Sequence, residues 1–375
     1  MIITAPLVLT PARALAPGWV EISGDSIAAV GEGTPNGPVD VPLTGTLVPG
    51  FVDTHVHGGG GASFDAGTAA AAATVTDAHL AHGTTSMIAS LVTMSHEDMD
   101  RAVRELALLV ADGRLAGIHL EGPWLSPLHR GAHDPVLLEN PSSERIAHVL
   151  ELGDGSIRMV TIAPELPGGP EAVAQLASAG VVAAVGHTDA TYEQATQALA
   201  SGATAGTHLF NAMTPLNHRA PGAVGALLDS DAVVELICDG VHLHPATIRL
   251  ATRLASDRFV LVTDAMAAAA SADGDYRLGP LDVFVRDGVA RLADGTIAGS
   301  TLTMARAVQF CVNVVGLPLE VVLPAATSRA ADHLGLARVG SIEPGYFADL
   351  VELSADLDVT RVMRRGSWVA SARSR

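Results

Sequence analysis

The sequence predicts an α/β protein: a (β/α)8 barrel of the TIM type, with a small β-sandwich domain built from both ends of the chain. Through the middle of the 375 residues, short β-branched runs alternate with alanine-rich helical stretches, which is typical of βα units and a parallel sheet. Eight strands over roughly 220 residues suit a closed barrel better than an open sheet. No Gly-x-Gly-x-x-Gly follows the first strand, so a dinucleotide-binding fold has little support.

The two ends differ from this middle region. Residues 1–48 and 341–375 contain short strand-like runs and glycine turns, and we expect them to meet in one small β domain. Residues 49–340 then form the predicted barrel. Within the barrel, Asp-Gly turns between alternating apolar residues at 282–300 predict a hairpin.

Each predicted strand of the barrel is a short run of apolar and β-branched residues, and helical stretches separate several of them. The predicted strands are residues 45–55, 84–93, 116–122, 157–164, 181–188, 203–210, 233–240 and 258–266. The predicted helices are residues 68–83, 96–113, 169–180 and 191–202.

The charge balance excludes some classes of partner. Forty acidic residues against 22 basic ones give a formal net charge of −18, whereas broad binding to nucleic acid or to anionic membranes needs a basic field. A small phosphorylated substrate is not excluded, because a few local cations can hold one phosphate. Although 48 % of the residues are hydrophobic, no apolar run reaches the roughly 18 residues that a membrane-spanning helix needs.

The compartment that we expect is the cytoplasm. The N-terminus has no basic residue before its apolar stretch and carries two prolines within 11 residues, which favours a strand and a turn over a signal peptide. The two cysteines, Cys238 and Cys311, give no disulfide framework and fit a reducing compartment.

Lysine is absent from the sequence, so all 22 basic residues are arginine. Mechanisms that need a Schiff-base lysine, a phosphate-loop lysine or a carbamylated lysine between two metals are therefore excluded.

Residues that can bind a metal or move a proton stand at the ends of six predicted strands. In such a barrel the C-terminal strand ends converge on the face that holds the active site. A single histidine is more often structural, and a His-x-His pair can be two buried core imidazoles. A whole set at successive strand ends nevertheless points to one site. In chain order the set is Asp53, His55, His57, His119, Glu121, His187, His208, Asp239, His242 and Asp264.

These residue types fit metal-dependent hydrolysis. Imidazoles and carboxylates hold a divalent cation such as zinc or iron, which lowers the pKa of bound water and polarises a carbonyl. Asp264, at the last strand, is placed to take a proton from water and pass it to a leaving nitrogen. Covalent catalysis by Cys238 is disfavoured, because a buried apolar cysteine is the more common case.

Seven motifs, taken together, carry a family resemblance: DTHVHG, GIHLEGPWLSPLHRGAH, AVGHTDA, GTHLFNAMTPLNHRAPG, CDGVHLHP, LVTDAMAAA and DGTIAGSTLTM. They resemble the N-acetylglucosamine-6-phosphate deacetylases of the amidohydrolase superfamily, over essentially the whole chain. HLEGP, HLFNAM followed by RAPG, and DGVH are specific to that family, whereas GFVDTH and GSIEPGYFADLV are general to the superfamily. The resemblance implies hydrolysis of the N-acetyl group of N-acetyl-D-glucosamine 6-phosphate to D-glucosamine 6-phosphate and acetate.

The resemblance also implies roles for residues by position. It makes Glu121, His187 and His208 the principal metal ligands and Asp264 the general base and then the general acid. The matching substrate-binding positions are His133, Asn211, Ala212, Arg219 and His242. In this family the arginine typically reaches the site of the neighbouring subunit, so the resemblance implies a homodimer. A guanidinium and imidazoles can hold a phosphate without any lysine.

One departure from the family pattern concerns the number of metal ions. Some members lack the His-x-His pair and hold one metal, whereas this chain has both His55 and His57. The pair predicts a second metal site with Glu121 bridging, so we expect one or two zinc or iron ions per subunit. The loop 124–135 could form a lid in which Trp124 and His129 cover the sugar, or these side chains could serve packing or face solvent.

Three alternatives stay open at this point. A deacetylase for N-acetylgalactosamine 6-phosphate differs only in the orientation of one hydroxyl, which sequence does not resolve. A cyclic-amide hydrolase is disfavoured by the HLFNAM and RAPG motifs and by the missing lysine. A non-catalytic scaffold would be expected to have lost ligands, yet each expected position is filled.

Overall fold

The computed structural model describes residues 1–11 and 13–370. The chain divides into two compact units. One comprises Met1–Asp53, Asp77–Ser86 and the chain from Thr303 on, and the other comprises Thr54–Thr76 and Met87–Leu302.

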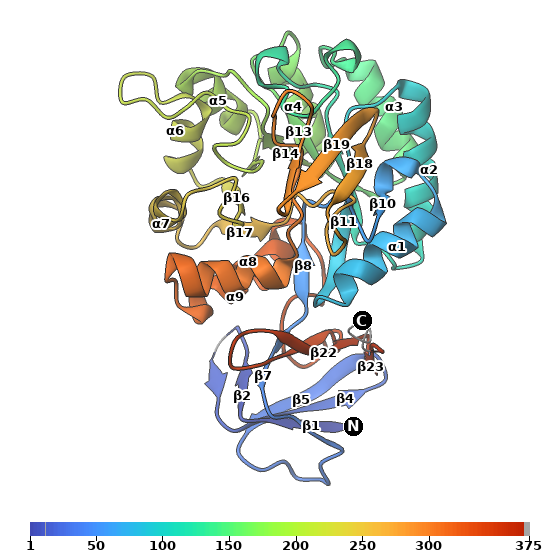
Figure 1. The fold of residues 1–375 in the computed structure, drawn as a ribbon, viewed down its shortest axis with the longest axis vertical. Helices are drawn as coiled ribbons and strands as arrows, with labels where there is room; N and C mark the ends of the chain where they lie inside the picture. Colours follow the sequence, from blue (N-terminus) through green and yellow to red (C-terminus); the bar gives the residue numbers. More distant parts are fainter. Residues whose placement is uncertain (12, 371–375) are drawn as a thin grey trace. The chain divides into compact units, whose positions relative to one another are not determined.

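The eight predicted barrel strands form one parallel sheet in which neighbours follow chain order (Figure 1), as crossover connections require. Beyond the strand ends, a parallel bridge joins Val56 to Ala265, and the Asp264 N–H donates to the His55 carbonyl at 2.8 Å. This bridge closes the barrel at its C-terminal end. The strands are β8 (Phe51–Asp53), β11 (Thr84–Leu91), β12 (Gly117–Glu121), β13 (Ile157–Ile162), β14 (Val182–Val185), β15 (Ala205–Gly206), β16 (Val233–Ile237) and β17 (Phe259–Val262).

The helices begin where the sequence offers caps. The Ser95 side chain accepts from the Asp98 N–H at the start of α2, and Thr191 with Gln194 forms a capping box at the start of α5. The helices are α1 (Ala69–Leu80), α2 (His96–Ala111), α3 (Ser143–Gly153), α4 (Gly169–Ser178), α5 (Tyr192–Ala200), α6 (Gly222–Leu228), α7 (Pro245–Leu254), α8 (Met304–Phe310), α9 (Leu319–Ala326) and α10 (Ser328–His333). Short helical turns are η1 (Phe64–Ala66), η2 (Pro127–His129), η3 (Pro135–Leu137) and the π-turn η4 (Cys311–Val315).

The chain ends form the predicted β-sandwich from two sheets, ordered β5-β4-β1-β6 and β23-β22-β21-β7-β2-β3. Val48 of β7 pairs with Val351 of β21, so the two ends of the chain share one sheet. Ile3 from the first sheet and Leu47 and Leu350 from the second are fully buried in one core. The strands are β1 (Ile2–Ala5), β2 (Leu7–Leu9), β3 (Ala14–Leu15), β4 (Gly18–Ser23), β5 (Ser26–Glu32), β6 (Val41–Pro42), β7 (Thr46–Pro49), β21 (Leu350–Leu353), β22 (Val359–Arg364) and β23 (Ser367–Trp368).

The run at 45–55 differs from its prediction, because it forms two strands rather than one. β7 belongs to the six-stranded sheet and β8 to the barrel, with Gly50 between them. A Cβ at Gly50 would lie 2.1 Å from Thr85 Oγ1, so the chain passes this point only because the residue is glycine.

The hairpin predicted at 282–300 is larger than expected. It is a three-stranded sheet of β18 (Gly274–Leu278), β19 (Leu281–Arg286) and β20 (Val289–Arg291). Leu278 and Val283 of this sheet share an apolar cluster with Val92 and Met266, which fixes the sheet beside the mouth of the barrel. A two-stranded ribbon of β9 (Gly58–Gly59) and β10 (Ala62–Ser63) follows β8.

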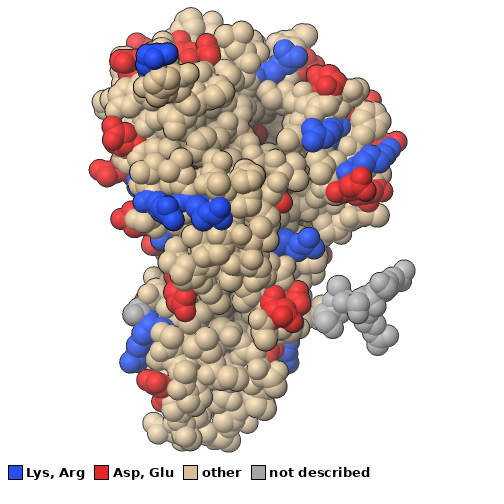
Figure 2. Space-filling view, turned by 60° about the vertical axis from the view of Figure 1, so that its left-hand side comes forward, with Lys and Arg blue, Asp and Glu red and all other residues tan. Residues whose placement is uncertain are grey.

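The face drawn in Figure 2 carries side chains of both charges. None of the described helices combines the length and the apolar character that crossing a membrane requires. On the face drawn in Figure 2, arginines are interspersed with acidic residues, and this face shows no continuous basic area.

Candidate metal centre and active site

Four predicted site residues have a left-handed backbone, Ala212 among them, and the other three stand at the same distance from a strand end. His187, His208 and Asp264 each lie two positions after the end of a barrel strand, β14, β15 and β17 respectively. Their φ angles are 47°, 28° and 48°. This left-handed region costs a residue other than glycine about 1–2 kcal/mol, and such strain clusters at functional sites. The repeated turn therefore marks the C-terminal mouth of the barrel as a functional site.

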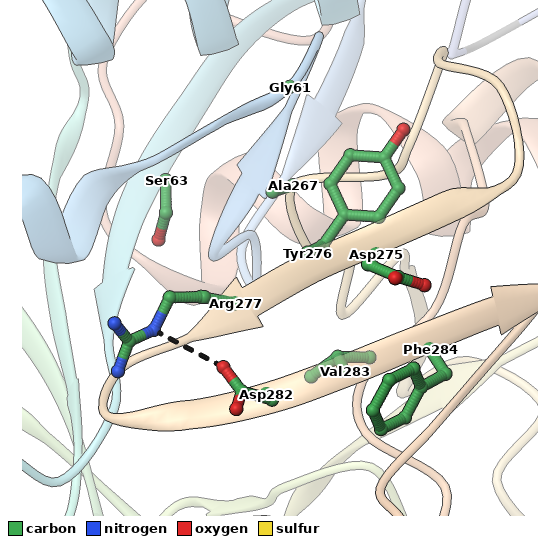
Figure 3. Close-up of a pocket in the computed structure, with 9 residues that line it drawn as sticks. All are labelled: Gly61, Ser63, Ala267, Asp275, Tyr276, Arg277, Asp282, Val283 and Phe284. Carbon is green, nitrogen blue, oxygen red and sulfur yellow. Dashed lines mark ion pairs between the residues drawn. The ribbon is translucent and has the colours of Figure 1, made fainter.

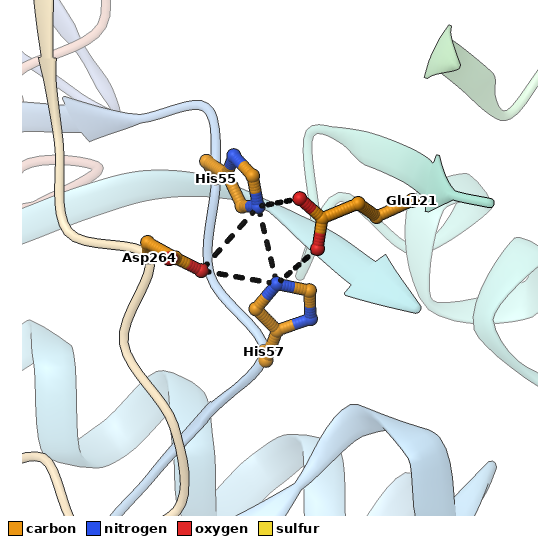
Figure 4. Close-up of side chains that lie close together, drawn as sticks. All are labelled: His55, His57, Glu121 and Asp264. Carbon is orange, nitrogen blue, oxygen red and sulfur yellow. Dashed lines mark hydrogen bonds and ion pairs between the residues drawn. The ribbon is translucent and has the colours of Figure 1, made fainter. Parts of the chain in front are cut away.

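The first group of ligand atoms comes from His55, His57, Glu121 and Asp264, all of them buried (Figure 4). His55 Nε2 lies 3.1 Å from His57 Nε2. His57 Nε2 in turn lies 3.1 Å from Glu121 Oε2 and 3.2 Å from Asp264 Oδ1. One ligand atom of each residue lies within 4.8 Å of all the others. Imidazole nitrogens and carboxylate oxygens from three strand ends thus converge on one point.

The second group shares Glu121 with the first. Glu121 Oε1 lies 3.2 Å from His187 Nε2 and 3.0 Å from His208 Nε2, and these two nitrogens are 3.1 Å apart. His133 completes the group, with its Nε2 3.5 Å from Glu121 Oε2. The Glu121 carboxylate therefore belongs to both groups.

The charges of the two groups stabilise one another. Burial alone would raise the pKa of Glu121 and of Asp264, but the neighbouring histidines, His55 first among them, together outweigh burial and hold both pKa values well below their usual range. Burial would lower the pKa of His57, yet its contacts with Asp264 and Glu121 raise that pKa to about 9. For His133 burial dominates instead and lowers the pKa to about 4.

This donor set fits a divalent cation. Imidazoles and carboxylates are the ligands that zinc and divalent iron take in proteins. His187 Nδ1 pairs with the His129 carbonyl oxygen at 2.9 Å, which turns Nε2 toward Glu121, the usual arrangement of a metal-binding histidine. The buried Nδ1 atoms of His57 and His208 have no hydrogen-bond partner within the described residues. Burying so many ionisable groups together is costly without a compensating cation.

A cavity of about 380 Å³ opens above these groups. The predicted site residues that line it are His57, Glu121, His133, His187, His208, Asn211, Ala212, His242 and Asp264. His55, the remaining member of the first group, is fully buried and does not line the cavity. Arg219 is exposed on its loop and does not line the cavity either.

His242 is held in place by Asp239. Its Nδ1 lies 2.7 Å from Asp239 Oδ2, and its backbone N–H donates to the same carboxylate at 2.8 Å. Burial would lower the pKa of His242, but Asp239 outweighs it and raises the pKa. The raised pKa favours the protonated imidazole, which is a cationic donor, at this wall of the cavity.

The remaining strand-end histidine, His119, lies apart from the ligand atoms. Its Nδ1 is 2.9 Å from Ser90 Oγ and its Nε2 is 2.8 Å from Thr161 Oγ1, while its ring meets the edge of the His55 ring at 4.6 Å between centroids. Burial holds the pKa of His119 well below its usual value. This neutral imidazole serves as part of the polar floor beneath the first group.

In the loop 124–135, Trp124 and His129, the two side chains whose role the sequence leaves open, have different surroundings. Trp124 is 1 % exposed and does not line the cavity, so it packs in the interior. His129 lines the cavity, with Nε2 3.0 Å from Asp189 Oδ1. Ser126 also donates its N–H to the His187 carbonyl at 2.9 Å. The loop therefore orients His187 through its backbone.

Sequence reasoning missed one wall of the cavity. Val92, Leu278 and Ile297 give it an apolar side, together with Thr296 and Gly299. Thr296, Ile297 and Gly299 belong to the motif DGTIAGSTLTM, which contributes to the family resemblance but predicts no role for these residues. No motif marks Leu278, because its place depends on how the three-stranded sheet packs.

A wider hollow of about 700 Å³ lies between this three-stranded sheet and the β9–β10 ribbon (Figure 3). Its charged side chains include Arg277 and Asp282, which are exposed and 3.8 Å apart. None of the metal-ligating groups found within the described residues lies there. The chemistry belongs to the first cavity.

The barrel and its converging imidazoles and carboxylates define a class: metal-dependent hydrolases that act at the C-terminal mouth of a (β/α)8 barrel. Comparison with known proteins agrees. The model of the amidohydrolase family matches residues 46–369, and the chain belongs to this family.

Individual relatives are more specific. The crystal structure of N-acetyl-D-glucosamine-6-phosphate deacetylase from Mycobacterium smegmatis is 50 % identical, with a TM-score of 0.96 and coverage of 99 % of this chain and 100 % of that one. The N-acetylglucosamine-6-phosphate deacetylase of Vibrio furnissii is 35 % identical over 90 % of this chain and 85 % of its own length. The N-acetylgalactosamine-6-phosphate deacetylase of Escherichia coli O157:H7 is 34 % identical over 93 % and 95 %. These similarities confirm the resemblance that the motifs indicate.

Proposed function

We propose that this amidohydrolase removes the N-acetyl group of N-acetyl-D-glucosamine 6-phosphate, which gives D-glucosamine 6-phosphate and acetate. The observation that carries the proposal is the cavity over Glu121, His187 and Asp264, with Asn211 and His242 around it. A variant of the Mycobacterium smegmatis relative, at 50 % identity, has been solved in complex with this sugar phosphate.

A divalent cation, zinc or iron, would be held by Glu121, His187 and His208, and a second by His55 and His57 with Glu121 shared. Such a cation, when bound, lowers the pKa of water and polarises the amide carbonyl. The chain holds the ligand atoms 3.0–3.2 Å from one another across the shared carboxylate, so little rearrangement is needed to bind it.

Asp264 is the residue that we assign to proton transfer. It lines the cavity, and its lowered pKa keeps the carboxylate ionised at neutral pH. It accepts a proton from water as the bond from water oxygen to the carbonyl carbon forms. It then gives that proton to nitrogen as the C–N bond breaks, so that acetate and the free amine leave.

The sugar phosphate would be held by Asn211, the Ala212 backbone, His133 and His242. The phosphate also calls for a guanidinium, and none of the described residues that line the cavity is an arginine. We assign this role to Arg219 of a second copy, which makes the functional unit a homodimer.

Mixing two inactive variants tests the homodimer. Arg219→Ala and Asp264→Asn, dissociated and reassociated together, would form mixed dimers in which one site regains both residues. Random pairing predicts about one quarter of the wild-type sites. No recovery in mixed dimers that have been shown to form would place Arg219 in its own subunit's site.

The experiment that tests the reaction is acetate release by metal-loaded protein from N-acetyl-D-glucosamine 6-phosphate, its galacto epimer and unphosphorylated N-acetyl-D-glucosamine. Rapid release from the first alone is the expected result. Faster release from the galacto epimer would favour the second candidate, which the Escherichia coli relative motivates. No release from any of the three, with metal bound, would remove the deacetylase assignment.

Two further assignments complete the proposal. We place the boundary of the small β domain at 1–48 and 341–375 and the barrel at 49–340; this is supported by the strands of the two end sheets, which lie within residues 2–49 and 350–368. We also assign the protein to the cytoplasm. Both cysteines are buried and neither forms a disulfide, as a reducing compartment allows.

A further inference from the structure

A buried carboxylate, Glu235, lies behind the metal centre, and the proposed reaction does not use it. Glu235 is in the middle of β16 and is 0 % exposed. It does not line the cavity, so it has no path to a substrate. Burying a carboxylate is strongly unfavourable unless charged or polar donors compensate it, so its neighbours indicate its role.

Three donors from two ligand-bearing segments meet at Glu235. The His55 ring lies with Nδ1 3.1 Å from Oε2, and Thr54 donates its hydroxyl to Oε1 at 3.3 Å. The backbone N–H of His208 donates to Oε2 at 3.4 Å. One side chain thus joins the segment of the His-x-His pair to the segment of His208.

The contact with His55 determines which ring nitrogen carries the proton. In a contact between a ring nitrogen and a carboxylate oxygen the nitrogen donates, so Nδ1 of His55 carries an N–H toward Glu235. Nε2, the atom that is 3.1 Å from His57 Nε2 and 3.4 Å from Glu121 Oε1, is then the ring nitrogen left to bind a cation. A carboxylate behind a histidine in this way fixes its orientation and makes it a stronger ligand.

The other side of the centre uses a weaker device. His187 Nδ1 pairs with a neutral carbonyl oxygen, that of His129, at 2.9 Å. The two imidazoles therefore present Nε2 to the same carboxylate, Glu121, but a carboxylate supports the ring of His55 and a carbonyl oxygen supports that of His187.

We propose that Glu235 is a positioning residue for the metal centre. It holds His55 in the tautomer and orientation that bind a cation on the side of His55 and His57. It thereby supports the affinity of that side through the His55 ring, whereas on the other side it contacts only the backbone of His208. The inference rests on the proposed function only in that the centre holds metal.

The test is the affinity of purified protein for Zn²⁺ and Co²⁺, measured by competition with a chelator, with the number of ions per subunit and the Co²⁺ absorption spectrum. Glu235→Gln keeps the shape of the side chain and removes its charge. We expect it to weaken binding about 10- to 100-fold and to change the Co²⁺ spectrum. Wild-type affinity and an unchanged spectrum would overturn the proposal.

Glu165→Gln is the matched control. Glu165 accepts from the Thr188 hydroxyl and the Asp189 N–H, so it supports the segment next to His187 without touching a ligand imidazole. We expect wild-type metal binding from this variant. An equal loss in both variants would mean that any buried or half-buried carboxylate near the centre has this effect, against the proposal.

A double-mutant cycle separates positioning from general destabilisation. If Glu235 acts through His55, Glu235→Gln should change metal affinity little in a His55→Asn background and fully in a His187→Asn background. An undiminished effect in the His55→Asn background would overturn the proposal. If Glu235→Gln does not fold, Thr54→Val replaces it, since losing that hydroxyl should weaken metal binding by a smaller factor. No weakening in Thr54→Val would then count against the proposal.

These measurements use no sugar. Lack of acetate release with an intact cycle would refute the proposed function alone, whereas normal release with unchanged metal affinity would refute the role of Glu235 alone.

Discussion

The two sides of the metal centre share Glu121 but are built differently. On the side of His55 and His57, Asp264 adds a second carboxylate and raises the pKa of His57 to about 9. On the other side, burial is the main influence on His133 and lowers its pKa to about 4. Residues of the same type, a few ångströms from the same carboxylate, thus differ in charge because of their neighbours. The side of His55 and His57 has two carboxylates, Glu121 and Asp264. On the other side, a backbone carbonyl of the loop 124–135 orients His187.

The largest effect should come from the residue common to both sides. Glu121→Gln is expected to remove metal from the centre and to lower deacetylation on the order of 10⁴-fold, because a bound metal supplies several kcal/mol of transition-state stabilisation. Metal content and acetate release measure this. Glu139→Gln, which disrupts an exposed pair with His96, is the control and should be unaffected. A Glu121→Gln protein with full metal content would refute the bridging role.

Asp264→Asn affects one side alone. It removes the proton carrier while asparagine still tolerates the left-handed backbone at this position. We expect about a 10³-fold loss of turnover, within the range for a general acid–base group, with metal retained by His187 and His208. Steady-state kinetics and metal content give the result. Near-normal turnover would mean that another group moves the proton.

The difference between His57 and His133 should be visible in the stability of metal-free protein against pH. His57 binds its proton more tightly when folded, so its contribution is complete below pH 6.5 and is lost as pH rises through about 9. His133 binds its proton less tightly when folded, so stability is lost as pH falls from 6.5 toward 4. One pKa unit is worth about 1.4 kcal/mol, so each contribution is on the order of 3 kcal/mol.

Two variants separate these contributions. In denaturant unfolding of metal-free protein, His57→Asn should flatten the alkaline limb of the stability profile and His133→Asn the acidic limb. If each variant retained the limb that it is expected to lose, the assigned charges would be wrong.

The smallest effect tests the loop side. Gly131 has a φ of 56°, and a Cβ there would lie 3.0 Å from His187 Cε1. Gly131→Ala should cost about 1 kcal/mol of stability and, by shifting His187, weaken metal binding several-fold. Thermal unfolding and chelator competition measure both, with Gly113→Ala as control, since its left-handed backbone has open space around it. Equal metal affinity in the two variants would show that the loop does not position His187.

The barrel strands and four of the helices could be predicted from the sequence, because periodicity is a local signal, whereas α3 and α6 to α10 were not predicted. The ends of the barrel strands could also be predicted. So could the residues at these ends that line the cavity, such as Glu121 and Asp264. The break at Gly50 was missed because it depends on the approach of Thr85, which lies far away in sequence.

Other parts of the site could not be predicted for the same reason. Glu235 sits within an apolar run and has no motif, and only barrel closure brings it to His55. Leu278 reaches the cavity through the packing of the three-stranded sheet. The place of Trp124 was left open, because a tryptophan beside a catalytic motif can either pack or bind. Its burial in the interior follows from tertiary structure.

The left-handed residues at the ends of β14, β15 and β17 have a consequence for engineering and evolution. Glycine at His187, His208 or Asp264 would relieve local strain of about 1 kcal/mol at each position, and the unliganded protein would lose a cluster of buried ionisable groups. Selection for heat resistance alone would therefore favour loss of the centre, whereas selection for turnover keeps it. In this barrel three turns that strain the backbone are also turns that carry the site.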